Sequence, residues 1–75
     1  MDVGARIASW RKAKGLSQRE LADAVGVTPA TIYQWEGTGR SRTNPTLTNL
    51  EAVARALGVT MARFFGVVPR AGARS

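Results

Sequence analysis

Residues 17–36, SQRELADAVGVTPATIYQWE, constrain the fold of this chain more than any other segment. Ser17 and Glu20 have the spacing of a capping box, in which each side chain accepts a hydrogen bond from the other residue's backbone N–H at the start of a helix. Apolar residues then recur at helical spacing up to a glycine, which readily adopts the left-handed backbone that closes a helix. Thr28 and Pro29 next form an N-cap and a first helical residue. The segment therefore predicts two short helices separated by a tight turn.

The second of these helices has two different sides. Two helices with so short a link cross steeply, which is the geometry of a helix-turn-helix and can present the second helix to a DNA major groove. Ile32 and Trp35 share one side and must face inward, whereas the opposite side is centred on Ala30, Tyr33 and Gln34. An amide can pair with adenine N6 and N7, and a small apolar group can contact a thymine methyl. We predict that these three residues contact bases; the alternative is a solvated helix surface.

Hydroxyl groups flank this predicted reading surface. Thr28 and Thr31 are placed as hydroxyl donors to phosphate, and such contacts fix the register of a protein on DNA rather than reading its sequence.

Three further helices are expected, and together they predict an all-α domain over residues 1–68. An N-terminal helix runs from about Val3 to Lys14 and ends at Gly15, and residues 37–45 form a loop. Thr46 caps a helix with the apolar stripe Leu47, Leu50, Val53, Ala54 and Leu57, which we expect in the core. Thr60 caps a last short helix, and residues 69–75 are expected to form a disordered basic tail.

An apolar cluster lies at the end of the predicted domain. Its members are Met61, Phe64, Phe65, Val67 and Val68. A domain of this size builds only a modest core, so self-association is a reasonable expectation. The cluster either closes the core or forms a dimer contact, and we favour the dimer contact.

Composition excludes several classes of function. The chain has no Cys and no His, so disulfides and the commonest metal ligands and general base are absent, and we predict no metal and no cofactor. No apolar run is long enough for a membrane span, which favours a cytoplasmic protein with no membrane partner. The net charge is +6, and residues 37–75 hold six of the eleven basic side chains but one of the five acids. This balance favours a polyanion such as nucleic acid as partner.

Three stretches resemble the Cro/C1-type (XRE-like) helix-turn-helix family of bacterial and phage DNA-binding regulators. They are ARIASWRKAKGLSQRELADAVGV, TPATIYQWEGTGR and NPTLTNLEAVARALGV, and they cover nearly all of residues 3–65. The resemblance implies a compact five-helix bundle of the lambda-repressor-like type, whose third helix, at about residues 29–36, enters the major groove. It also implies binding to a near-palindromic operator as a homodimer.

The resemblance further implies roles for individual residues. Pro29, Ala30 and Gln34 match base-facing positions, although many members place polar residues at the first two, so we expect sparse direct readout and more shape readout. The implied phosphate contacts are Gln18, Thr31, Arg40 and Arg42, and the implied structural ion pair joins Arg11 to Glu36.

These observations predict a sequence-specific transcriptional regulator, a repressor, that binds double-stranded DNA. The alternative is a small antitoxin-type module that neutralises a protein partner and autoregulates its operon. An enzyme is disfavoured, because two of the five acids already have structural roles and no nucleophile–base pair or phosphate-binding glycine loop is present.

Overall fold

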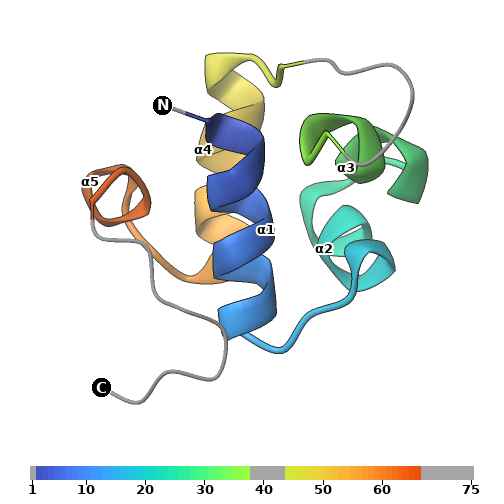
Figure 1. Cartoon of the computed structure of the whole chain (residues 1–75), viewed down its shortest axis with the longest axis horizontal. Coiled ribbons are helices and arrows are strands. Elements are labelled where there is room, and N and C mark those ends of the chain that lie inside the picture. The colour runs from blue at the N-terminus through green and yellow to red at the C-terminus, as the bar shows by residue number, and fades with distance from the viewer. Residues whose placement is uncertain (1, 38–43, 67–75) are drawn as a thin grey trace.

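The computed structural model describes residues 2–37 and 44–66, which form five helices and no strand. The helices are α1 (Val3–Ala13), α2 (Gln18–Val25), α3 (Pro29–Trp35), α4 (Leu47–Leu57) and α5 (Met61–Phe64). Figure 1 shows α1 and α4 at the centre, α2 and α3 on one side of them, and α5 on the other. The predicted all-α fold is confirmed over the described residues, whereas the expected tail at residues 69–75 lies outside them.

Polar side chains fix where the helices begin. The N-caps are Asp2, Ser17, Thr28, Thr46 and Thr60, and each side chain accepts a hydrogen bond from a backbone N–H in the first turn. The predicted capping box is present: the Ser17 hydroxyl accepts from the Glu20 N–H at 3.0 Å, and the Glu20 carboxylate accepts from the Ser17 N–H at 2.8 Å. Because these signals are local in sequence, the starts of the helices were predictable.

A glycine turn sets the angle between α2 and α3. Gly26 has a φ of 91°, in the left-handed region that favours glycine. The N–H groups of Gly26 and Val27 both donate to the Ala22 carbonyl, at 2.8 and 3.0 Å, which closes α2. Thr28 then caps α3 immediately, so α3 begins within a few residues of the end of α2.

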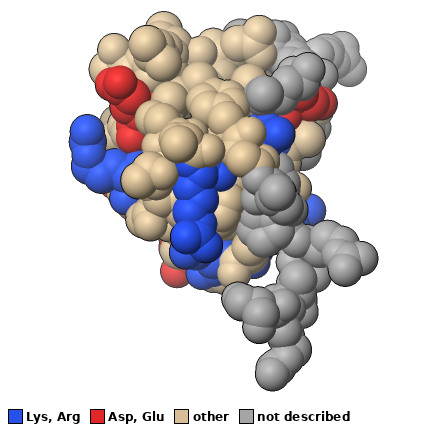
Figure 2. All heavy atoms as spheres, turned by 90° about the vertical axis from the view of Figure 1, so that its left-hand side faces the viewer, with Lys and Arg blue, Asp and Glu red and all other residues tan. Residues whose placement is uncertain are grey.

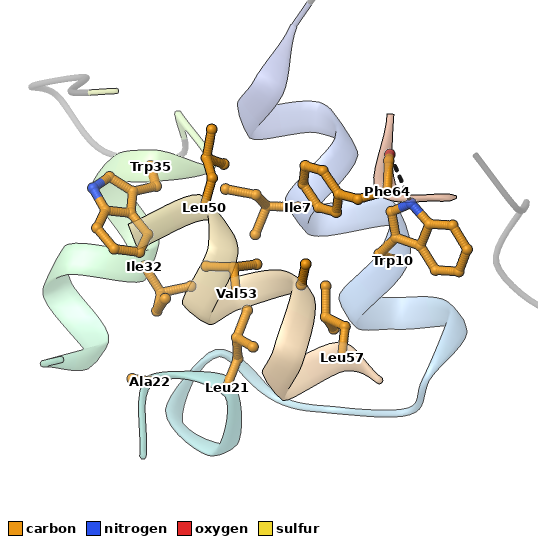
Figure 3. Close-up of a cluster of buried hydrophobic side chains, with 11 residues drawn as sticks. Ile7, Trp10, Leu21, Ala22, Ile32, Trp35, Leu50, Val53, Leu57 and Phe64 are labelled. Carbon is orange, nitrogen blue, oxygen red and sulfur yellow. Dashed lines mark hydrogen bonds between the residues drawn. The ribbon is translucent and has the colours of Figure 1, made fainter. Parts of the chain in front are cut away.

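The core lies where all five helices meet (Figure 3). Its buried apolar residues are Ile7, Trp10, Leu21, Ala22, Ile32, Trp35, Leu50, Val53, Ala54, Leu57 and Phe64. The inward side predicted for α3 is therefore confirmed. The prediction that Leu47 lies in the core is wrong: it is the first residue of α4, and 66% of its surface remains exposed because the neighbouring helices do not cover that end.

Phe64 ties α5 to the rest of the domain. Its side chain is completely buried, and Figure 3 places it beside Ile7 and Trp10 of α1. The prediction that the Phe64 side chain forms a dimer contact is therefore wrong, because it is already enclosed within one copy of the chain. Met61 and Phe65 are partly exposed and remain candidates, and Val67 and Val68 lie outside the described residues.

Hydrogen bonds from α1 hold the end of α5 in place. The Trp10 indole Nε1–H donates to the Phe64 carbonyl at 3.2 Å. Arg6 Nη1 donates to the same carbonyl at 3.2 Å and to the Gly66 carbonyl at 2.6 Å. These carbonyls have no partner within the short helix, so the two α1 side chains act as a C-terminal cap supplied from a distant part of the sequence.

Gly4 allows α1 to lie against the end of α3. A Cβ atom at this position would overlap the Trp35 carbonyl oxygen and would come within 3.2 Å of the Glu36 backbone. The contact therefore requires a residue without a side chain, although Gly4 has ordinary helical geometry. This close approach brings the start of α1 to the residues that carry the site described next.

Among the described residues, none of the helices is long and apolar enough to cross a membrane.

Candidate nucleic-acid interface

The outward side of α3 is a small, uncharged surface. Ala30 and Tyr33 are exposed, Tyr33 to 46%, and Gln34 is half-buried. These residues stand three and four positions apart, so they share one side of the helix, while Ile32 and Trp35 are buried on the other. We call Ala30, Tyr33 and Gln34 the reading surface.

The residues at the start of α3 are held by local hydrogen bonds. The Thr28 hydroxyl oxygen accepts from the Thr31 N–H at 3.2 Å and lies 2.9 Å from the Thr31 hydroxyl. Pro29, the first helical residue, is half-buried and has no N–H to offer. Two hydroxyls bonded to each other still leave one O–H or lone pair for an outside group, which suits the phosphate role predicted for both threonines.

A buried ion pair joins α1 to the end of α3. Arg11 Nε donates to Glu36 Oε2 at 2.7 Å, and Arg11 Nη2 donates to Glu36 Oε1 at 3.1 Å. A third guanidinium donor, Nη1, reaches the Leu16 carbonyl at 2.8 Å. The Glu36 side chain is 1% exposed and that of Arg11 11%, so the predicted pair is present, desolvated and bidentate.

Gln18 joins the same network from α2. Its Nε2 donates to Glu36 Oε1 at 3.0 Å. The carboxylate of Glu36 thus links α1, α2 and the end of α3. Gln18, the first residue of α2, is half-buried.

The remaining predicted phosphate contacts, Arg40 and Arg42, lie outside the described residues. The described residues hold no group of three or more metal-binding side chains. What the structure does bring together is an uncharged helix surface, a hydroxyl pair at its start and an amide beside it, each of which can contact DNA bases or phosphates.

Comparison with known proteins identifies the family. Residues 7–64 match the helix-turn-helix family of the Cro/C1 type. The chain belongs to this helix-turn-helix family. The match spans α1 from its second turn through α5, so it includes the whole core as well as the reading surface.

Helix-turn-helix relatives include repressors and regulators. The immunity repressor of Bacillus phage phi105 is 39% identical over 66 residues, which are 88% of this chain and 44% of the repressor. The chain thus spans less than half the length of that relative. The DNA-binding domain of the P22 c2 repressor superposes with a TM-score of 0.80 at 31% identity, covering 92% of this chain and 88% of that domain.

A restriction-modification regulator has the same fold. The controller protein C.AhdI from Aeromonas hydrophila superposes with a TM-score of 0.75 at 33% identity, covering 85% of this chain and 92% of that protein. These matches support a DNA-binding transcriptional regulator with the fold of the lambda-repressor-like domains.

The sequence did not reveal two features of this helix-turn-helix domain. One is the bond between Gln18 and Glu36, because the pairing of Glu36 with Arg11 already accounted for its charge. The other is the hydrogen bonding of Arg6 and Trp10 to the end of α5. The acceptors are backbone carbonyls, which every residue has, so the sequence does not show which of them are used.

Proposed function

We propose that this helix-turn-helix protein is a repressor that binds a near-palindromic operator as a homodimer, with α3 in the major groove of each half-site. The observation that carries the proposal is the two-sidedness of α3. Its inner side is fixed in the core by Ile32 and Trp35, and its outer side presents the reading surface without a covering element among the described residues. A helix so held can meet base edges without a large loss of conformational freedom.

The contacts divide into reading and positioning groups. Gln34 can pair with adenine, and Ala30 and Pro29 can contact a thymine methyl. Thr28, Thr31 and Gln18 offer neutral donors to phosphate, while the basic side chains of the chain, which give it a net charge of +6, attract the DNA backbone. Because few of the reading groups are polar, sequence-dependent DNA shape contributes to the choice of operator.

A second copy of the chain is proposed to bind along α5. Figure 2 faces this side of the molecule and shows an area without charged side chains in its upper centre, bordered by acidic side chains at both edges and by basic side chains below. Met61, the first residue of α5, and Phe65, directly after it, are partly exposed and would supply the apolar contact. A two-fold pair of domains explains why the operator would be near-palindromic.

Repression follows from occupancy of the operator, and the names of the phi105 and P22 relatives support it. The deciding experiment is selection of binding sites from randomised duplex DNA at physiological salt. We expect one enriched motif with two inverted half-sites, separated by about one helical turn of DNA or a multiple of it. A failure to enrich any motif would contradict sequence-specific binding, and a single asymmetric half-site would contradict the homodimer alone.

Transcription from a reporter promoter that carries the selected site then tests the direction of regulation. We expect the protein to lower expression, and higher expression would identify an activator instead.

A further inference from the structure

The carboxylate of Glu36 makes more hydrogen bonds than its ion pair requires. It accepts two from Arg11, at 2.7 and 3.1 Å, and a third from the Gln18 amide at 3.0 Å. The third bond adds little to the neutralisation of a carboxylate that already faces a guanidinium. The bond instead restrains the side chain of Gln18, a half-buried residue at the start of α2.

The chemistry of the pair fixes which way the Gln18 amide points. A side-chain amide has an oxygen and a nitrogen of nearly equal size, so packing alone does not choose between its two orientations. An ionised carboxylate only accepts hydrogen bonds, and therefore the amide nitrogen must face Glu36. Within the described part of the chain the second N–H on Nε2 has no acceptor, so it can donate to a group outside the protein from a position set by the first bond.

The charge of the carboxylate that holds this amide is balanced within the protein. An unpaired carboxylate beside the start of α2 would repel phosphate, but Arg11 balances Glu36 within the network. Gln18 is the first residue of α2 and is half-exposed, whereas the Glu36 side chain is almost entirely covered. The carboxylate can therefore orient the amide without presenting its own charge to the DNA.

We propose that Glu36 is a positioning residue that orients the Gln18 amide to donate its free N–H to a DNA phosphate. This inference rests on the DNA-binding function proposed above and assigns part of it to a residue that does not itself touch DNA. An amide that is ordered before binding loses less rotamer freedom when it meets the phosphate. Glu36 thus acts on affinity as well as on the packing of α1 against α3.

The first test measures the motion of the amide in the free wild-type protein. The nitrogen-15 order parameter of the Gln18 side chain is compared with that of Gln34, which has no side-chain hydrogen bond among the described residues and serves as an internal control. We expect a value above about 0.8 for Gln18 and below about 0.6 for Gln34. Equal mobility of the two amides would overturn the proposal, and this measurement needs no variant to fold.

The second test is a double-mutant cycle on DNA affinity with Gln18→Met, Glu36→Gln and the double variant, using the duplex selected in the operator experiment. Gln18→Met keeps the length of the side chain and removes its donors. We expect it to weaken binding about tenfold in the wild-type background and about threefold or less beside Glu36→Gln, because the new amide at position 36 can present either its oxygen or its NH2 group and no longer fixes one orientation of the Gln18 amide. Any general effect of the charge lost in Glu36→Gln is present with and without Gln18→Met, so it cancels when the effect of Gln18→Met is compared between the two backgrounds.

The outcomes separate the positioning role from simpler roles. If Gln18→Met costs the same factor in both backgrounds, Glu36 is only a structural residue and the proposal is wrong. Thermal unfolding of all four proteins identifies losses that come from instability. If the wild-type protein binds no duplex, the DNA-binding function itself fails, which is a different result from a wild type that binds without coupling between the two residues.

Discussion

At the scale of single residues, the reading surface of α3 offers few groups that distinguish bases. Ala30 has only a methyl group, so its contact is limited to apolar groups such as the methyl of thymine. Gln34 has an amide with no side-chain hydrogen bond among the described residues, and in the proposed complex we expect it to be the main donor–acceptor pair for a base edge.

Replacing Gln34 by alanine is expected to remove preference at one base pair in each half-site. The loss of a paired hydrogen bond to one base corresponds to about 1–3 kcal/mol of discrimination. The lost discrimination is measured from the affinities of the wild type and the variant for a set of duplexes, each with one changed base pair. Thr31→Val is the control: it removes a hydroxyl predicted to meet phosphate and should weaken every duplex by a similar factor. A uniform loss for Gln34→Ala would remove Gln34 from the reading surface.

Gly4 provides a second test at this scale. For Gly4→Ala, helix propensity predicts a higher free energy of unfolding, whereas packing predicts a lower one. Within a helix, Ala is favoured over Gly by about 0.5–1 kcal/mol. At Gly4 a methyl group would overlap the Trp35 carbonyl, so we expect Gly4→Ala to lower the free energy of unfolding by about 1–3 kcal/mol instead. Urea unfolding measures the change.

The matched control for this substitution is Ala5→Gly at the next, exposed position of α1. It should cost about 1 kcal/mol through propensity alone. A Gly4→Ala variant that is more stable than the wild type would show that α1 does not approach α3 as closely as the structure has it.

At the scale of elements, the helix boundaries were predictable and some of the contacts between helices were not. Caps such as Ser17 and Thr46 act on residues two or three positions away, so their signal is contained in a short stretch of sequence. Leu47 was wrongly placed in the core, because its periodicity fits the apolar stripe but no neighbouring element covers the first turn of α4. Whether a residue at the end of a helix is buried depends on segments that are distant in the sequence. The periodicity of the helix itself therefore does not predict it.

The last helix shows how far the stability of an element can depend on distant residues. A four-residue helix has almost no stability of its own, because several turns of hydrogen bonds are needed to offset the unfavourable free energy of helix nucleation. Here α5 is held by the buried Phe64 ring and by donors from Arg6 and Trp10 to its terminal carbonyls. Its place in the fold thus depends on residues of α1, far away in the sequence.

Removing the Arg6 guanidinium should therefore loosen α5 selectively. We expect Arg6→Met to lower the free energy of unfolding by about 1.5–3 kcal/mol, the range for a hydrogen bond to a charged group. Amide hydrogen exchange should accelerate at Phe64 and Phe65 and change little in α2 and α3. Arg55→Met, at an exposed position of α4, is the control for the lost charge. Equal acceleration along all helices would indicate global destabilisation instead.

At the scale of the whole molecule, the proposed function assigns different tasks to the two sides of the bundle. The helices α2 and α3 lie on one side of the central pair α1 and α4, and α5 lies on the other (Figure 1). A dimer formed along α5 would leave the reading surfaces of both copies free. The sequence pointed to the apolar cluster but could not separate its members, because Phe64 and Phe65 are adjacent and equally apolar. Only the packing shows that Phe64 is enclosed while Phe65 is partly exposed.

The partly exposed member of this pair tests the proposed dimer. A carboxylate in an apolar contact must be desolvated without a partner, so we expect Phe65→Glu to weaken self-association at least tenfold, as measured by sedimentation equilibrium. Binding to the full operator should fall by a larger factor than binding to an isolated half-site, because a single domain still reads its half. Arg55→Gln, which also lowers the net charge by one, should leave self-association unchanged. If Phe65→Glu stays as dimeric as the wild type, the contact between copies lies elsewhere on the bundle.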